Sequence, residues 1–368
     1  MSVNVVFGKP AEPAKFYHKK KRVSVDAAFE MYRNNARFVV GGKTLNVNRF
    51  GTTQDIHEAA ENGNHQLVAD LAENGADLNL KGKNGWAPAH RAAGGGYDKV
   101  MQVLADYGAD LNIGISDSGA TPALISAEVG TYKVMQILAD EGADLDLSNE
   151  YGETPLIMAV GSGHLETVRV LVNEGANVDL TDRGDAGGYE DEDGWFSVTP
   201  LWHAAKQGHH KIVRVLVENG ANLDAVGQFG YTPVFVATKR GHRETVRVLA
   251  DMGANLNLGT KKSNDDDIER SIESFDIVSI PKGATPVWMA AYTGRTDIVR
   301  LLATKGANLD RAMRDLNVFE SAYVVDLLKA YERRRIGRDK RHVRSVARQI
   351  GLPEDMEGVI GSLLKSNI

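Results

Sequence analysis

The sequence predicts an all-α solenoid of seven stacked helix-turn-helix units with short, hairpin-like loops and helical capping extensions. Three series of residues in fixed register predict it. The first series consists of the glycines Gly63, Gly96, Gly130, Gly163, Gly208, Gly241 and Gly294. A second glycine follows each of these by 12 residues, from Gly75 to Gly306. Nine residues before the first glycine stands Thr-Pro in five units, with Gln54-Asp55 and Ala87-Pro88 in the other two.

Each landmark predicts one part of the unit. A threonine hydroxyl caps free N–H groups and proline suits the first helical position, so Thr154-Pro155 predicts the start of a first helix. Glycine tolerates a left-handed backbone, so Gly163 predicts its end. Val168, Leu171 and Val172 then recur at helical spacing, which predicts a second helix with one apolar side. A short extended piece and a projecting loop complete the unit.

These units resemble the ankyrin repeat. The resemblance rests on starts such as Thr154-Pro155-Leu156, on Gly163-His164 at the turn, and on Gly-Ala-Asn/Asp-Leu at each unit's end. It covers residues 49–310 and implies a protein-binding solenoid without catalysis. The family's usual histidine after Thr-Pro-Leu survives only as His57 and His90, so we expect different hydrogen bonding in the other units.

The remaining residues are expected to extend or cap the solenoid. Loop insertions at about 181–194 and 260–282 lengthen two projecting loops, where added length costs little. Residues 1–48 predict an extended arm followed by a capping helix at about 25–38. Residues 311–368 predict a C-terminal capping helix and a basic helical tail. End units need such covers because each core face is completed by a neighbour.

The composition excludes several classes of site. Without cysteine, the chain has no disulfide, thiol nucleophile or cysteine-ligated zinc. A net charge of −6 argues against general nucleic-acid binding, and no run of about 18 apolar residues is present for membrane insertion. No nucleotide-binding, hydrolase or calcium-loop motif is complete. We therefore expect no catalysis, cofactor, metal site or small-molecule substrate, in a cytoplasmic protein for which nuclear or cytoskeletal association remains an alternative.

The resemblance implies that partners bind the concave side, which the first helices and loop tips form. Over units three and four this side offers an apolar centre, and over units five and six a basic stretch. The candidate partner-binding residues are Trp86, Arg91, Ile125, Val129, Tyr151, Met158, His203, Lys206, Phe229, Tyr231, Lys239, Arg240, Met289 and Tyr292.

We therefore expect a protein-protein interaction scaffold or adaptor that binds one or more proteins. The expected ligand is an acidic or amphipathic segment of a partner. The alternative is a non-catalytic structural subunit of a large cytoskeletal or ciliary assembly, held by its basic terminal extensions.

Overall fold

A computed structural model describes residues 3–6, 15–18, 21–23, 38–40, 43–45, 53–82, 84–182, 197–261, 280–319 and 321–349. The chain divides into two bodies, residues 1–176 and 177–368, each of which is considered by itself.

The first body begins with short strands. In the first sheet, β1 (Val3–Val6), β2 (Lys15–His18) and β3 (Lys21–Val23) pair antiparallel in that order, with Val3 opposite His18 and Phe16 opposite Val23. A second pair, β4 (Phe38–Val40) and β5 (Lys43–Leu45), places Phe38 opposite Leu45. The capping helix expected at 25–38 lies outside the described residues, apart from Phe38, which begins β4.

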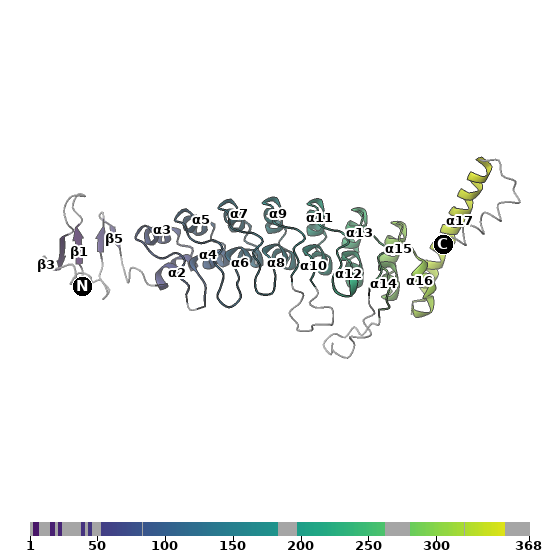
Figure 1. Cartoon of the computed structure of the whole chain (residues 1–368), viewed down its shortest axis with the longest axis horizontal. Coiled ribbons are helices and arrows are strands. Elements are labelled where there is room, and N and C mark those ends of the chain that lie inside the picture. Colours follow the sequence, from purple (N-terminus) through teal and green to yellow (C-terminus); the bar gives the residue numbers. More distant parts are fainter. Residues whose placement is uncertain are drawn as a thin grey trace. The chain divides into compact units, whose positions relative to one another are not determined.

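Four helix pairs follow in the first body: α2 (Thr53–Glu61) and α3 (His65–Glu73), α4 (Pro88–Gly95) and α5 (Asp98–Asp106), α6 (Pro122–Val129) and α7 (Tyr132–Asp140), and α8 (Pro155–Ser162) and α9 (Leu165–Asn173). The first helices pack on one another in one layer and the second helices in another (Figure 1). This confirms the predicted helical repeat.

The second body continues with three helix pairs: α10 (Pro200–Gln207) and α11 (His210–Glu218), α12 (Pro233–Arg240) and α13 (Arg243–Asp251), and α14 (Pro286–Tyr292) and α15 (Thr296–Thr304). Within this body too, the first helices pack in one layer and the second helices in another (Figure 1). A short 3₁₀ turn, η1 (Gln228–Gly230), precedes α12. After α15 come α16 (Asp310–Arg314), the 3₁₀ turn η3 (Leu316–Val318) and the long α17 (Ala322–Gln349). No described helix is both long enough and apolar enough to cross a membrane.

The predicted helix signals act as expected. Oγ1 of Thr154 accepts the backbone N–H of Ile157 at 3.3 Å, and the threonines that precede α6, α10, α12 and α14 do the same. Gly130 ends α6 with φ of 85°, and a Cβ there would lie 2.5 Å from Nδ1 of His164. Only glycine satisfies both the left-handed backbone and this close approach.

Small and aliphatic side chains fill the space between the layers. Ala92 and Ala93 of α4 are fully buried, as is Ala204 of α10, so neighbouring first helices can approach closely. Val100 and Leu104 of α5 are also fully buried, on the apolar side that the helical spacing predicts.

The projecting loops share one closing pair of residues. In the short loops the N–H of the first residue donates to the carbonyl of the fourth residue after it, as from Gly82 to Trp86, or of the fifth. The same bond joins Asp182 to Val198 at 3.3 Å and Thr260 to Ala284 at 3.1 Å. Each long loop therefore leaves and rejoins its body at the residues that close the short ones. The inserted residues 183–196 and 262–279 lie outside the described residues.

A row of Asn and Asp side chains links the ends of successive units. In the first body, Oδ1 of Asn79 accepts the N–H of Asp110, and Oδ1 of Asn112 accepts that of Asp144, both at 2.8 Å. In the second body the acceptors are Asp179, Asp224 and Asn257, each of which bonds the backbone of the following unit. This row explains why Asn or Asp recurs four residues after the second glycine of a unit, as at Asn79. The Asn or Asp directly after Gly-Ala has another role: Oδ1 of Asp77, for example, accepts the N–H of Asn79 at 2.9 Å.

Removing one cap should weaken the fold measurably. In Thr232→Ala, the N–H of Phe235 loses a buried acceptor, so we expect the free energy of unfolding to fall by about 1 kcal/mol. Thr232→Ser keeps the oxygen and should stay near the wild-type value. Urea denaturation followed by circular dichroism measures both. Equal loss in the two variants would show that the methyl group matters and the cap does not.

Candidate functional site

The histidines at the turns between first and second helices make structural hydrogen bonds. Nε2 of His164 donates to the carbonyl of Glu128, and Nε2 of His242 donates to that of Lys206, each at 3.0 Å. Arg295 replaces the histidine in the last unit and donates to the carbonyl of Lys239 at 3.3 Å. Each bond ties a turn to the preceding first helix. Among the described residues, no three His, Asp or Glu side chains are grouped so that they could hold a metal ion.

Hydrogen bonding inside the first helices differs between units, as the lost histidines predict. Nδ1 of His90 accepts the N–H of Ala87 at 3.0 Å, and Nε2 donates to the carbonyl of Ala120 at 2.9 Å. In α10 the indole N–H of Trp202 takes over the second bond and donates to the carbonyl of Tyr231 at 3.0 Å. An indole at this position thus supplies the donor that histidine supplies in α4.

Burial shifts the titration of these histidines. Desolvation lowers the pKa of His90, although hydrogen bonds to the backbone carbonyls of Ala120 and Ile113 oppose the shift. The pKa of His57 is lowered by desolvation first and then by the charge of Arg91. Both side chains therefore favour the neutral form in the folded protein.

The exposed side of the first helices carries aromatic–cation pairs. In the first body, the guanidinium carbon of Arg91 lies 5.0 Å from the ring centre of Trp86, and Arg91 also pairs with Glu61 at 3.5 Å. In the second body, Nζ of Lys206 lies 5.4 Å from the ring of Trp202, and Nζ of Lys239 lies 5.3 Å from that of Tyr231. The rings hold these cations at fixed places on the helix surface.

The candidate residues differ widely in exposure. Val129 and Tyr151 are exposed at 49% and 46%, and Arg240 is also exposed. An intermediate group consists of Trp86, Arg91, Met158, His203, Lys206, Phe229, Lys239 and Tyr292. Within the body to which it belongs, each of these side chains has surface that a partner protein could contact.

Three candidates are buried, so the prediction that their side chains face a partner is wrong. Ile125 is 8% exposed, Tyr231 4% and Met289 1%. Tyr231 stacks on Phe235 with ring centres 4.6 Å apart, and burial raises the pKa of its hydroxyl. Such side chains support the surface from beneath. Helical periodicity alone did not reveal this burial.

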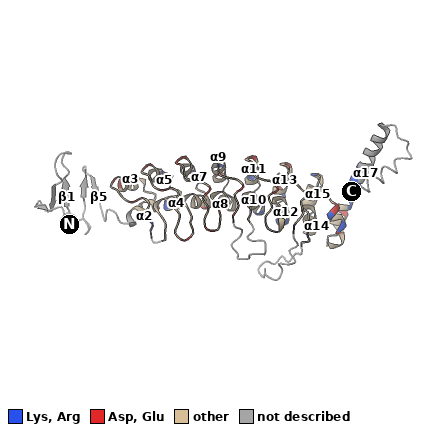
Figure 2. Ribbon diagram, in the orientation of Figure 1, with Lys and Arg blue, Asp and Glu red and all other residues tan. Residues whose placement is uncertain are grey.

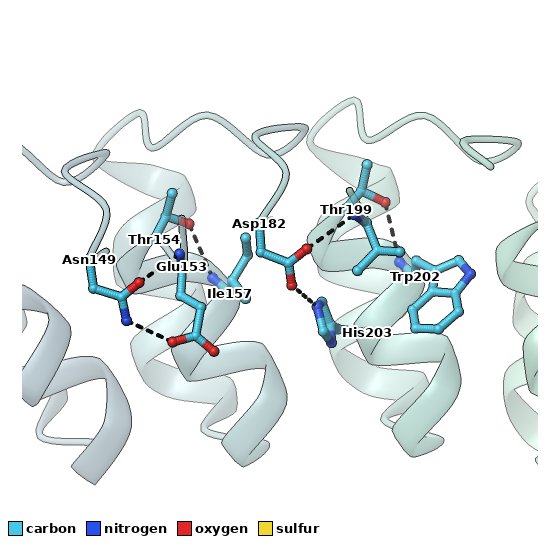
Figure 3. Close-up of polar contacts among 9 residues, drawn as sticks. Asn149, Glu153, Thr154, Ile157, Asp182, Thr199, Trp202 and His203 are labelled. Carbon is cyan, nitrogen blue, oxygen red and sulfur yellow. Dashed lines mark hydrogen bonds and ion pairs between the residues drawn. The ribbon is translucent and has the colours of Figure 1, made fainter. Parts of the chain in front are cut away.

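His203 has a structural partner that the sequence analysis missed (Figure 3). Asp182 is buried; one carboxylate oxygen lies 2.6 Å from Nε2 of His203 and the other accepts the N–H of Val198 at 3.1 Å. Asn149, which stands 33 residues earlier at the same repeat position, accepts the N–H of Glu153 at 3.0 Å. The sequence signal that could have identified Asp182 is its place 33 residues after Asn149, which is one repeat length. Its bonds fix the base of the first long loop.

Comparisons with known proteins agree with this architecture. The family model described as ankyrin repeats (3 copies) matches residues 37–115, 56–148, 113–182 and 183–260, and the single ankyrin repeat model matches residues 282–314. The crystal structure of the ankyrin repeat domain of Bcl-3, described as a unique member of the IkappaB protein family, is similar over 68% of this chain and 99% of its own, with 25% identity and a TM-score of 0.54.

An ankyrin repeat domain from Acinetobacter baumannii AYE is 29% identical over 55% of this chain and 100% of its own, with a TM-score of 0.48. No curated protein matches the sequence.

The lowered pKa of His90 makes stability depend on pH. Because His90 binds a proton less readily when folded, protonation favours the unfolded chain, so its contribution to stability is complete above pH about 6.5 and declines as the pH falls below that value. His90→Leu, which copies Leu124 of the third unit, should cost about 1–3 kcal/mol at pH 7.5 through its lost hydrogen bonds. It should also flatten the loss of stability between pH 7 and about 5.

Denaturation midpoints across this range measure the effect. His65→Gln changes an exposed histidine of the same body and should keep the wild-type slope. A His90→Leu slope equal to wild type would refute the assignment.

Proposed function

Because the chain belongs to the ankyrin repeat family, we propose that it is a scaffold or adaptor that binds another protein on the exposed side of its first helices and catalyses no reaction itself. Ankyrin repeats generally serve as protein–protein interaction modules. The coarse function follows from the family, whereas the residues that make contact are our inference from the surface of each body.

The observation that carries the proposal is the basic row of the second body. Lys206 and Lys239 lie in the last turns of α10 and α12, at the same position of consecutive repeats, and Arg240 follows in α12. Each lysine extends over an aromatic ring. Because the rings already restrict these side chains, less conformational entropy is lost when a partner's carboxylates bind. The row therefore suits an acidic segment.

The first body offers apolar contacts on the same side of its helices. Val129 and Tyr151 are exposed and Met158 is partly exposed. Gly161 carries no side chain, and a Cβ added there would meet no heavy atom within 4 Å. Apolar anchors contribute most of the energy of many protein interfaces, and charges mainly steer the approach. This surface therefore suits an amphipathic partner.

We extend the proposal to a cytoplasmic location, which imaging of a tagged full-length chain tests. The alternative of a structural subunit held by basic extensions differs in which residues it requires. It needs the cations of α17, whereas the scaffold needs those of α10 and α12.

Charge reversal on the basic row should abolish most binding. Proteins that crosslink to the wild-type chain in native extract are identified by mass spectrometry, and recovery of the same proteins is then measured for Lys239→Glu/Arg240→Glu. We expect recovery to fall roughly tenfold, because two attractive contacts become repulsive. Lys211→Glu/Arg214→Glu, on exposed positions of α11, makes the same change of charge and should keep wild-type recovery.

A steric block tests the first body separately. Gly161→Trp adds bulk to α8 where space is open, so the fold should persist while recovery of partners that contact this body falls. Unchanged recovery for both the charge and the steric variants would overturn the proposal. Loss of recovery only when α17 cations are reversed would instead favour the subunit.

A further inference from the structure

The helix α17 is fixed to the second body by its first half. Val324 and Leu328 are fully buried, and α17 packs against α15 and α16. Arg335 donates to Asp310 at 2.9 Å and to Glu332 at 3.0 Å, which joins the helix to α16. The helix then continues for 14 residues to Gln349, a length of about 21 Å.

The charge of α17 is strongly positive and lies mainly on one side. Its 28 residues include nine Lys or Arg against three Asp or Glu. Lys329, Arg333, Arg334 and Arg338 are exposed. Figure 2 shows Lys and Arg segments, in blue, in the described first part of α17. At 3.6 residues per turn, positions 340, 341, 344 and 348, all Lys or Arg, continue the same half of the helix. Arg335 lies off this side and is the cation that bonds α16.

The second half of α17 also has an apolar side. Positions 336, 343, 346 and 347 are Ile, Val, Val and Ala, and their spacing of seven, three and one residues places them in one arc, away from the centre of the basic side. Position 339, an Asp, is the one acidic position in this arc. The helix therefore continues past its attachment to the body as a basic amphipathic segment.

We propose that α17 binds the surface of an anionic phospholipid bilayer, with the helix lying in the plane of the headgroups. Lys and Arg near an anionic membrane surface are attracted to it, and clusters of four to eight such residues on an amphipathic helix are typical of binding to acidic lipids. Arginine also forms paired hydrogen bonds with phosphate oxygens. The apolar positions enter the boundary between headgroups and acyl chains.

The apolar side is the reason to favour a bilayer over nucleic acid. Phosphate backbones would bind the basic side but would leave positions 336, 343 and 346 without apolar contact. A membrane surface uses both sides of one helix. The repeats would then be held beside the membrane with their first helices still open to a protein, so this inference is independent of the proposed scaffold function.

Vesicle flotation with the full chain tests the inference. We expect binding to vesicles of phosphatidylcholine and phosphatidylserine at about four to one, little binding to phosphatidylcholine alone, and release as salt is raised. Arg333→Glu/Arg334→Glu/Arg338→Glu should lower the partition coefficient by more than about tenfold, since three attractions become repulsions. Lys99→Glu/Lys133→Glu/Lys211→Glu changes the net charge equally at exposed positions elsewhere and should bind as wild type.

The apolar side is tested without a change of charge. Val343→Ser/Val346→Ser should lower vesicle binding several-fold, because less apolar surface is buried. Helical content and the unfolding midpoint of every variant serve as folding controls. Equal binding to neutral and anionic vesicles, or unchanged binding by either α17 variant, overturns the inference. Tighter α17-dependent binding to a 20-base-pair RNA duplex than to the vesicles would assign the helix to nucleic acid instead.

Discussion

Each repeat leaves polar groups that a neighbouring repeat satisfies, and these bonds hold the repeats together within each body. The carbonyl of Glu128 at the end of α6 receives its hydrogen bond from His164 in the next unit. The side chain of Asn79 in turn accepts the backbone N–H of Asp110. A single helix pair would lack these bonds and would leave its apolar side in water, so the units gain stability by stacking.

The same requirement restricts what the side chains can do chemically. The turn histidines His164 and His242, for example, are committed to carbonyls of the preceding first helix. The candidate partner-binding side chains stand on the outer side of the first helices, where Lys206 and Lys239 lie over aromatic rings. One set of side chains therefore bonds within the stack, and a separate set lies on its outer side. This separation is the physical basis for a binding surface.

Sequence variation between units is tolerated when the bonding between units is preserved by other means. Trp202 replaces the usual histidine and still donates to the carbonyl of Tyr231, whereas Asp182 replaces the asparagine found as Asn149 and bonds both His203 and Val198. The second substitution occurs where the loop is long. A buried carboxylate with two partners closes that loop at the same place as a short one.

The sequence by itself determined the repeat, its phase and the ends of its helices, because caps, left-handed glycines and apolar spacing are local properties of a few residues. It also indicated which side of each first helix faces outward, and most candidate residues there retain exposed surface. Only the tertiary structure decided that Ile125, Tyr231 and Met289 are buried and that His203 bonds Asp182. It also decided that Arg335 fixes α17, whereas Lys329, Arg333, Arg334 and Arg338 are exposed. These features depend on contacts between distant residues, whose distances no periodic pattern specifies.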